Sequence, residues 1–415
     1  MTPLSGIRVL DFSRHMAGPH ATAAMSDYGA DVIKVETLRG DPSRFTGVDF
    51  VGDESALFLM WNRGKRSISL DLTQPEATEV VKKLVATVDV VVENYRPGQA
   101  DKFGFGYEEL SAINDQIVYV SVSAFGAEGP LAALPGTDPV VQAASGIMSV
   151  TGERDGGPNL VGIPIADYAG SMQCMQAVLL GLLARERTGR GQHVKVSMLA
   201  GLLSSLTTRL ASYWVRGENP QRFGSAHSIV VPYEAFQTSD GYAVAGVWGG
   251  NDGWRPFCEV INRLDLFDEP RFRQNADRVR HREELRKILE PVFASRTTKA
   301  WAEDFHSRGV LFSPVNTFSD ILEHEQVTSS GLLQTVEHPT LGSIPQLGPV
   351  VDLTDTPGRI SGPPPLLGQH SIEILQEAGL DENEIASLIG AGVVGTFRDS
   401  AMAAAESTNA STPRS

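Results

Sequence analysis

Residues 7–36 read IRVLDFSRHMAGPHATAAMSDYGADVIKVE. Ile7–Phe12 and Asp31–Glu36 are short apolar runs of the kind that form buried strands. Between them, Pro19 stands at a position that the first turn of a helix tolerates, and Gly29 ends the helix. The stretch therefore predicts one β-α-β unit.

The same alternation of strand and helix continues as far as residue 200. Helices are expected at Glu76–Ala86, Tyr107–Ile113 and Met172–Arg185, and strands at Val88–Glu93, Ile117–Ser123 and His193–Met198. Strands that alternate with helices predict a parallel, doubly wound α/β sheet.

The pattern changes after residue 200. A helical connector is expected at Leu202–Trp214, and a hairpin turns at Ser239-Asp240-Gly241 between strands Tyr233–Thr238 and Tyr242–Val247. The expected later helices are Trp254–Ile261, Arg282–Ser295, Lys299–Arg308, Ser371–Ala378 and Glu382–Ile389. This second region therefore reads as a smaller α+β domain.

Composition limits the function classes. The chain has 415 residues, enough for two domains, and its net charge of −15 argues against nucleic acid and anionic membrane as partners. No segment has the length of apolar sequence that a membrane span requires, and the N-terminus does not read as a signal peptide. Cys174 and Cys258 lack metal-type spacing, so we expect reduced thiols, no metal site and a cytoplasmic protein.

Asp167 is the only charged side chain between Asp155 and Arg185. It stands where a long apolar helix begins, and Thr188-Gly189 ends that helix. One interpretation makes Asp167 the N-cap of the helix, and the other makes it a carboxylate nucleophile at the positive helix end. The two are compatible. The apolar face of the helix is expected to consist of Met172, Met175, Val178, Leu179 and Leu182.

Familiar catalytic motifs are missing. The first β-α turn, DFSRHMAGPHATA, contains the single glycine Gly18, so it lacks the GxGxxG pattern of dinucleotide sites although Glu36 closes the second strand. No P-loop, GxSxG elbow or HExxH helix is present. His227 is either a site residue or a loop histidine bonded to the backbone. A dinucleotide oxidoreductase is therefore disfavoured.

Ligand-binding candidates lie near strand ends. Asn94 and Tyr95 follow a strand at its carboxyl end, where α/β sheets bind ligands, and the Tyr95 ring could stack on a base. Basic residues form either a solvated face or a site for a phosphate-bearing ligand. They cluster at Arg63, Lys65 and Arg66, and again at Arg96 and Lys102.

Several runs, in this order, resemble the class III CoA-transferases, the formyl-CoA transferase and carnitine CoA-transferase family. They are PLSGIRVLDFSRHMAGP, GADVIKVE with GDPSR, NRGKRSISLDL, VVVENYRPG with DKFGFGYEEL, IADYAGSMQ, RTGRGQHVKVSML, PYEAFQTSDGYAV and PPPLLGQHSIEIL. Together they extend from residue 3 to about residue 376.

The resemblance implies a CoA-transferase in which Asp167 is the nucleophile. Asp167 would form an anhydride with the donor acyl group and then an aspartyl-CoA thioester. CoA thioesters would be substrates, and no permanent cofactor would be needed. The resemblance also assigns CoA contacts to Met16, Ala17, Leu70, Thr73, Asn94, Tyr95, Arg96 and Lys102.

The family fold implies an interlocked homodimer of ring-shaped chains. Each chain would have a Rossmann-like large domain built from both chain ends, plus the small α+β domain. The Pro-rich return at Gly362–Leu367 agrees with such a ring. The expected boundaries are 1–200 and 361–395 for the large domain, 201–223 and 326–360 for linkers, 224–325 for the small domain, and 396–415 for a disordered tail.

Some positions depart from the formyl-CoA transferases. Those enzymes carry Gln where this chain has Met16, Tyr where it has Thr137 and Arg where it has Thr37, and their Gly-rich small-domain loop is missing here. These departures argue against formyl or oxalate specificity. The main alternative is an α-methylacyl-CoA racemase, an isomerase of the same superfamily. Thr137 stands where racemases carry their catalytic His, so the racemase alternative is disfavoured. A catalytically silent acyl-CoA binding protein is disfavoured because Asp167 is retained.

Overall fold

The computed structural model describes residues 2–248 and 251–397, so most of the expected C-terminal tail lies outside the described residues. The chain folds into two compact units. The large unit holds the chain up to residue 147, residues 161–210 and the chain from 328 onward. The small unit holds 148–160 and 211–327.

The large unit is built on a seven-stranded sheet in the order β14-β5-β2-β1-β6-β7-β8. Neighbouring strands from β5 to β8 are parallel, as in the pairing of Val9 with Val32 and with Val90, which confirms the predicted parallel sheet. β14 pairs antiparallel with β5 at one edge. The strands are β1 (Arg8–Asp11), β2 (Asp31–Glu36), β5 (Arg66–Leu70), β6 (Val90–Glu93), β7 (Val118–Ser123), β8 (Gln192–Ser197) and β14 (Val394–Gly395).

Strand β5 was not predicted because its side chains are partly polar. Ser67 and Ser69 are fully buried within the strand. The Ser67 hydroxyl donates to Glu36 Oε1 at 2.7 Å, and the Ser69 hydroxyl donates to the Thr37 carbonyl at 3.2 Å. Buried serines that are hydrogen-bonded replace the apolar residues that an internal strand usually shows.

Helices cover both faces of the sheet, as a doubly wound fold requires. Alternate strand residues face opposite cores: Val9 packs on one side and Leu10 on the other. The first face carries α1 (Pro19–Asp27), α6 (Asp138–Ser145), α8 (Ile165–Thr188) and α9 (Met198–Ser205). The second carries α3 (Pro75–Val85), α4 (Gln99–Lys102), α5 (Tyr107–Ser111), α18 (Ser371–Glu377) and α19 (Glu382–Gly390).

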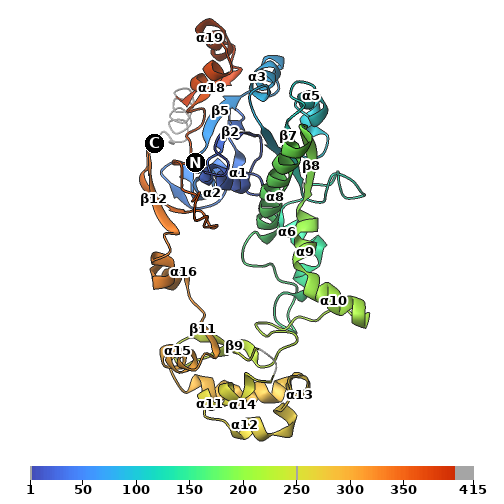
Figure 1. Cartoon of the computed structure of the whole chain (residues 1–415), viewed down its shortest axis with the longest axis vertical. Helices are drawn as coiled ribbons and strands as arrows, with labels where there is room; N and C mark the ends of the chain where they lie inside the picture. Colours follow the sequence, from blue (N-terminus) through green and yellow to red (C-terminus); the bar gives the residue numbers. More distant parts are fainter. Residues whose placement is uncertain (1, 249–250, 398–415) are drawn as a thin grey trace, which may run out of the picture. The chain divides into compact units, whose positions relative to one another are not determined.

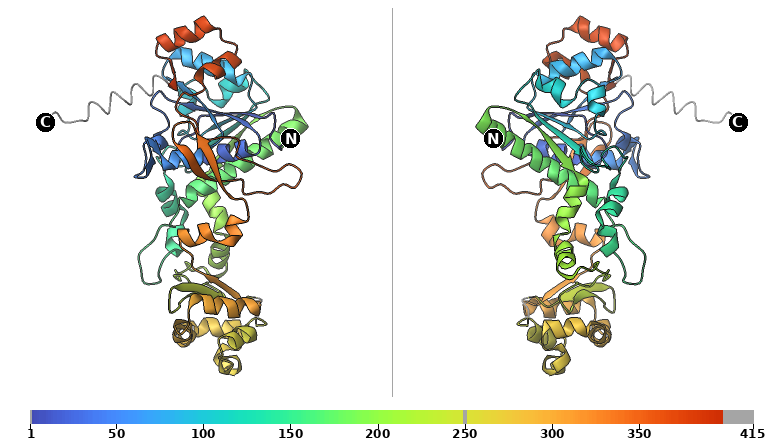
Figure 2. Two further views of the ribbon diagram at one scale, coloured as in Figure 1. Left: turned by 90° about the vertical axis from the view of Figure 1, so that its left-hand side faces the viewer. Right: turned by 90° about the vertical axis from the view of Figure 1, so that its right-hand side faces the viewer.

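The C-terminal part of the chain returns to this sheet. α18 and α19 lie beside α3 in all views (Figures 1 and 2), and Lys83 of α3 pairs with Glu384 of α19 at 3.6 Å. The expected return linker also contains a hairpin, β12 (Leu333–His338) and β13 (Gly342–Leu347). Gln346 of β13 donates to the carbonyl of Leu59 in α2 (Ala56–Trp61) at 3.0 Å. The hairpin is therefore part of the large unit.

The buried face of α8 differs from the prediction. It consists mainly of small residues, whereas Leu179 is 43% exposed and Leu180 is 58% exposed. At Gly181 a Cβ atom would lie 2.4 Å from Val118 Cγ1 of β7, so α8 approaches the sheet too closely for larger side chains. The buried residues are Ala166, Gly170, Ser171, Cys174, Ala177, Val178 and Gly181.

The small unit packs helices against a three-stranded antiparallel sheet, β11-β10-β9. The predicted hairpin is confirmed, with Tyr242 opposite Gln237. β11 was not predicted. The strands are β9 (Tyr233–Gln237), β10 (Tyr242–Gly246) and β11 (Leu311–Pro314). The helices include α11 (Trp254–Val260), α12 (Asp265–Asp268), α13 (Asn275–Arg280), α14 (Arg282–Ala294), α15 (Thr298–Ser307), α16 (Phe318–Glu323) and α17 (Glu325–Thr328).

Short elements complete the described chain. They are η1 (Pro42–Arg44), β3 (Phe50–Val51), β4 (Glu54–Ser55), α7 (Ile147–Val150), α10 (Thr207–Arg216) and η2 (Pro270–Phe272). Within the described ranges, every helix is too short or too polar to span a bilayer.

Candidate active site

Asp167 is the third residue of α8, and the N-cap position belongs to Pro164. The N-cap interpretation of Asp167 is therefore wrong. The helix start is capped by Asp138, the first residue of α6. Asp138 Oδ1 accepts from the backbone N–H groups of Ala166 at 2.6 Å and of Asp167 at 3.2 Å. Gln142 donates to the other Asp138 oxygen at 2.6 Å, so both Asp138 oxygens are engaged.

The Asp167 carboxylate itself is half-buried and has no hydrogen bond or ion pair within the described ranges. Burial, together with the nearby charge of Asp138, raises the pKa of Asp167 to about 7. The positive end of α8 favours the ionised form. A half-buried, unpaired carboxylate with a raised pKa is more basic than an ordinary surface carboxylate, which suits a nucleophile.

His20 of α1 lies next to this helix end, and the sequence analysis did not single it out. Its Nδ1 lies 2.9 Å from the hydroxyl of Ser171, one helical turn after Asp167, and its ring lies 5.8 Å from that of Tyr168. Burial and the charges of Arg63 and Lys65 lower the pKa of His20 to about 4. The ring is therefore neutral at neutral pH and does not pair electrostatically with Asp167.

The first β-α turn, residues 13–18, is held by side chains from other strands. Asn94 Oδ1 accepts from the backbone N–H of Arg14 at 2.8 Å, and its Nδ2 donates to the Arg14 carbonyl at 2.7 Å. Lys34 donates to the Ser13 carbonyl at 2.9 Å. The Asn94 amide is thus engaged by Arg14, and direct CoA contact by Asn94 stays a prediction.

A buried ion network lies beneath this turn. Lys65 donates to Asp11 at 2.9 Å, and Lys34 pairs with Asp41 at 2.8 Å. All four side chains are almost completely buried. Asp41 also accepts from the backbone N–H of His15 at 3.2 Å. The network therefore holds the turn through Asp41 and Lys34, which bond to its backbone.

The basic cluster at residues 63–66 forms neither a solvated face nor a phosphate site. Arg63 is buried and pairs with Asp27 at 2.6 Å, while Lys65 belongs to the ion network. Arg66 pairs with Asp31 at 2.7 Å and also with two glutamates of α18. Both predictions for this cluster are wrong because acidic partners from distant segments of the chain neutralise it.

A cavity of about 410 Å³ lies beside the turn and includes three predicted CoA contacts, Leu70, Thr73 and Tyr95. Arg14 and Arg39 also line it, and the sequence analysis named neither. The Arg14 guanidinium lies 4.4 Å from the centre of the Tyr95 ring. Within the described ranges neither arginine pairs with a carboxylate. Asp71 also lines the cavity, so two arginines and one aspartate leave it with a positive formal charge, which favours an anionic ligand.

A second cavity, of about 470 Å³, is lined by Asn94, Tyr95 and Arg96 together with Arg14. It extends to Thr137, the residue before Asp138. This cavity therefore reaches to within one residue of the carboxylate that caps the Asp167 helix. The lining of this cavity does not include Asp167, and the two are linked through Asp138, whose Oδ1 accepts from the Asp167 backbone N–H.

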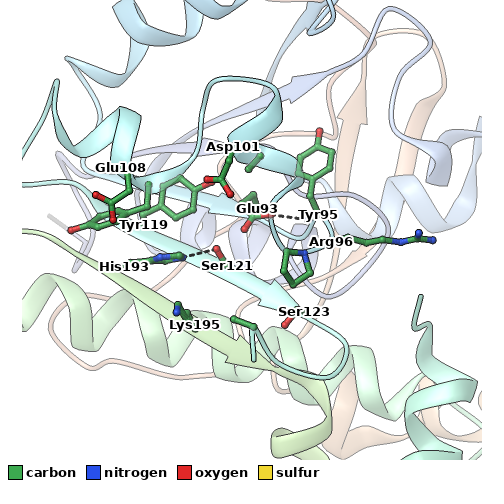
Figure 3. Close-up of a pocket in the computed structure, with 15 residues that line it drawn as sticks. Glu93, Tyr95, Arg96, Asp101, Glu108, Tyr119, Ser121, Ser123, His193 and Lys195 are labelled. Atoms are coloured by element: carbon green, nitrogen blue, oxygen red, sulfur yellow. Dashed lines mark hydrogen bonds between the residues drawn. The ribbon is translucent and has the colours of Figure 1, made fainter. Parts of the chain in front are cut away.

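Figure 3 shows a third cavity, of about 220 Å³, where Tyr95 and Arg96 leave the end of β6. The buried Glu93 carboxylate accepts from the backbone N–H of Tyr95 at 2.7 Å. Burial raises the pKa of Glu93 to about 7. His193 of β8 lies 2.8 Å from the Ser121 hydroxyl of β7. By accepting from the Tyr95 N–H, Glu93 fixes the backbone at the end of β6, and Tyr95 lines all three cavities.

Other predicted residues lie outside these cavities. Met16 and Ala17 are buried in the first β-α turn, and Lys102 is exposed in α4. His227 lies in the small unit, where its Nδ1 accepts from the Val230 N–H at 3.2 Å and its ring stacks on Tyr233. The interpretation of His227 as a loop histidine bonded to the backbone is confirmed.

A model of CoA-transferase family III matches residues 4–371. The chain belongs to this family. It is therefore a family III CoA-transferase, as the resemblance implied, and enzymes of this family use CoA thioesters as substrates.

Relatives within family III cover most of the chain. Mouse succinyl-CoA:glutarate CoA-transferase is 40% identical over 95% of this chain and 91% of its own length. Succinate–glutarate CoA-transferase of Agrobacterium fabrum is 36% identical over 90% and 95%. A crystal structure of a CAIB/BAIF family protein from Brucella suis, 33% identical, superposes with a TM-score of 0.82 over 91% of this chain and 99% of that one.

Proposed function

We propose that this family III CoA-transferase moves CoA through covalent intermediates on Asp167. The Asp167 carboxylate attacks the donor thioester carbonyl, giving an aspartyl mixed anhydride and the CoA thiolate. The thiolate attacks the aspartyl carbonyl, giving an aspartyl-CoA thioester and the free donor acid. The acceptor carboxylate then attacks that thioester and releases the thiolate. Attack of the thiolate on the acceptor acyl group gives the new acyl-CoA and restores Asp167.

The observation that carries the proposal is the unpaired, half-buried Asp167 carboxylate at the start of α8. Each step exchanges one carboxylate or thiolate for another, so the mechanism calls for no metal or redox cofactor. The racemase alternative needs an acid–base group at Thr137, and a threonine hydroxyl is a poor base.

We place CoA in the cavity lined by Leu70, Thr73, Tyr95, Arg14 and Arg39, with the arginines meeting its phosphates. Arg96, from the neighbouring cavity, extends the same basic rim. Met16 and Ala17 act through the shape of the turn, and Asn94 holds that turn in place. Lys102 contributes at most a distant charge.

The names of the relatives point to dicarboxylic acids. We therefore propose succinyl-CoA as a donor and glutarate as an acceptor. A CoA-exchange screen tests this, with succinyl-CoA and acetyl-CoA offered against a panel of mono- and dicarboxylic acids and products read by mass spectrometry. Transfer to glutarate well above transfer to monocarboxylic acids supports the proposal. Transfer confined to monocarboxylic acids contradicts the substrate but leaves the reaction class intact.

We also propose the interlocked homodimer. Large apolar side chains are exposed on the described single chain, including Leu179 and Leu180 of α8 and Trp214 and Val215 of α10, which are 75% and 87% exposed. Linked rings cannot exchange subunits while folded, so mixing tagged and untagged protein should yield no hybrid dimers. Rapid exchange or an active monomer would contradict it. The cytoplasmic location stays a prediction, with which the buried free thiols Cys174 and Cys258 agree.

A further inference from the structure

The small unit contains a cavity of about 560 Å³ whose lining is unusually basic for this chain. Four arginines and two glutamates line it, so its formal charge is positive although the whole chain carries −15. The arginines come from separate segments of the small unit and converge on one space. They are Arg154, Arg216, Arg280 and Arg282.

Arg282 is the most unusual member of this set. It is only 8% exposed and begins α14. Its Nη2 donates to the carbonyls of His227 at 2.9 Å and Ser228 at 3.1 Å, and its guanidinium lies 4.9 Å from the Phe223 ring centre. Its Nη1 is buried and has no hydrogen-bond partner within the described ranges. An unsatisfied, buried guanidinium nitrogen costs stability unless a ligand accepts from it.

The other arginines leave positive charge available. Arg216 has no carboxylate partner among the described residues, and Arg280 pairs only with its own helix neighbour Asp277, at 3.1 Å. Arg154 and Glu283 are 3.7 Å apart, a loose pair. The two lining glutamates therefore do not neutralise the cavity.

We propose that this cavity is a binding site for a small oxyanion, with carboxylate or phosphate groups accepting from Arg282 and its neighbours. Guanidinium groups bind both kinds of oxyanion through paired N–H donors. The site belongs to the small unit and is additional to the Asp167 site of the large unit. Two sources supply this chemistry in the proposed reaction: the free dicarboxylic acid and the phosphorylated adenosine end of CoA.

Hydrogen exchange of the full chain tests the site. The probes are glutarate, adenosine 3′,5′-bisphosphate and, as a control, potassium chloride at the same ionic strength. We expect glutarate or the bisphosphate to slow exchange in the peptides that span residues 275–285. Protection by one probe identifies the source, and protection by both identifies a general oxyanion site. Equal protection by chloride, or none by either probe, overturns the proposal.

Matched variants locate the effect without disturbing Arg282, whose backbone contacts support folding. The double variant Arg216→Gln and Arg280→Gln should bind the probe that protects the wild-type protein about 10-fold more weakly. Arg255→Gln is the control because Arg255, like Arg280, is an exposed arginine paired within its own helix, and it does not line the cavity. If the double variant and the Arg255→Gln control bind the probe with equal affinity, the proposed site is wrong. Protection should persist in Asp167→Asn protein, so failure here is separate from failure of the proposed reaction.

Discussion

Two aspartates of the large unit have opposite surroundings: Asp11 is buried at the end of β1, and Asp167 is half-buried near the start of α8. Asp11 accepts from Lys65 at 2.9 Å, from Thr22 at 2.6 Å and from the Ser13 backbone at 2.9 Å. Burial alone would raise the pKa of Asp11, but the charges of Lys65 and Lys34 and these hydrogen bonds lower it. Asp167 has no such partner within the described chain, and its pKa is raised to about 7.

The difference separates charges that support the structure from charges that are free to react. The charges of the Asp11 network are paired with one another, and the network holds the first β-α turn. The Asp167 carboxylate is positioned only through its backbone, by Asp138, so its oxygens remain available. The same distinction applies to arginines: Arg44 is paired with Glu36 and Glu54, whereas Arg39 is unpaired beside a cavity.

The largest expected effect comes from the unpaired aspartate. Asp167→Asn should lower transfer by at least about 10³-fold while the fold survives, because no side-chain contact is lost. Initial rates and circular dichroism measure the two properties. Asp155→Asn, at an exposed loop carboxylate, is the matched control and should leave activity unchanged. An active Asp167→Asn enzyme, checked by mass spectrometry for deamidation, would remove the distinction between the two aspartates.

The paired aspartate should respond in stability instead. Lys65→Met leaves the Asp11 charge buried without its main partner, which should cost roughly 3–5 kcal/mol of unfolding free energy. Lys82→Met is the control, because Lys82 forms an exposed pair with Glu79 and should cost less than about 1 kcal/mol. Denaturant unfolding measures both. Equal costs would show that the buried network does not stabilise the fold.

Among the cations, Arg39→Gln should weaken binding of an acyl-CoA about 10-fold without lowering stability, because it removes an unpaired charge beside the proposed CoA cavity. Lys102→Gln, at an exposed lysine outside that cavity, should weaken binding less. Calorimetric titration of both variants with CoA and dephospho-CoA measures the difference. A larger loss at Lys102 would move the phosphate site to α4.

The smallest effect concerns pH. Asp138→Asn can still accept from the backbone of α8 but removes the negative charge that helps raise the pKa of Asp167. Since Asp167 must be ionised to attack, wild-type kcat/KM should rise with pH through about 7, and the variant's rise should occur at lower pH. A pH profile of kcat/KM between 5 and 9 tests this. An unchanged profile would mean that Asp138 acts only as a cap.

Sequence patterns predicted the parallel sheet and the hairpin because their strands are apolar or alternate in the usual way. β5 was missed because it is partly polar and pairs with the distant strand β2, and the β12–β13 hairpin was missed because most of its residues are exposed. At the site, motif resemblance pointed to Asp167, Leu70, Thr73 and Tyr95. It could not find the capping role of Asp138 or the unpaired state of Arg39, because both depend on contacts between segments far apart in the chain.

Trapping the enzyme during turnover tests the covalent role of Asp167. Full-length protein is mixed with an acyl-CoA donor, quenched with borohydride or hydroxylamine, digested and sequenced by mass spectrometry. We expect a single modified residue, Asp167, with Asp11 unmodified and no modification in the absence of donor. Steady transfer with no modified carboxylate, or modification of a different residue, would contradict it.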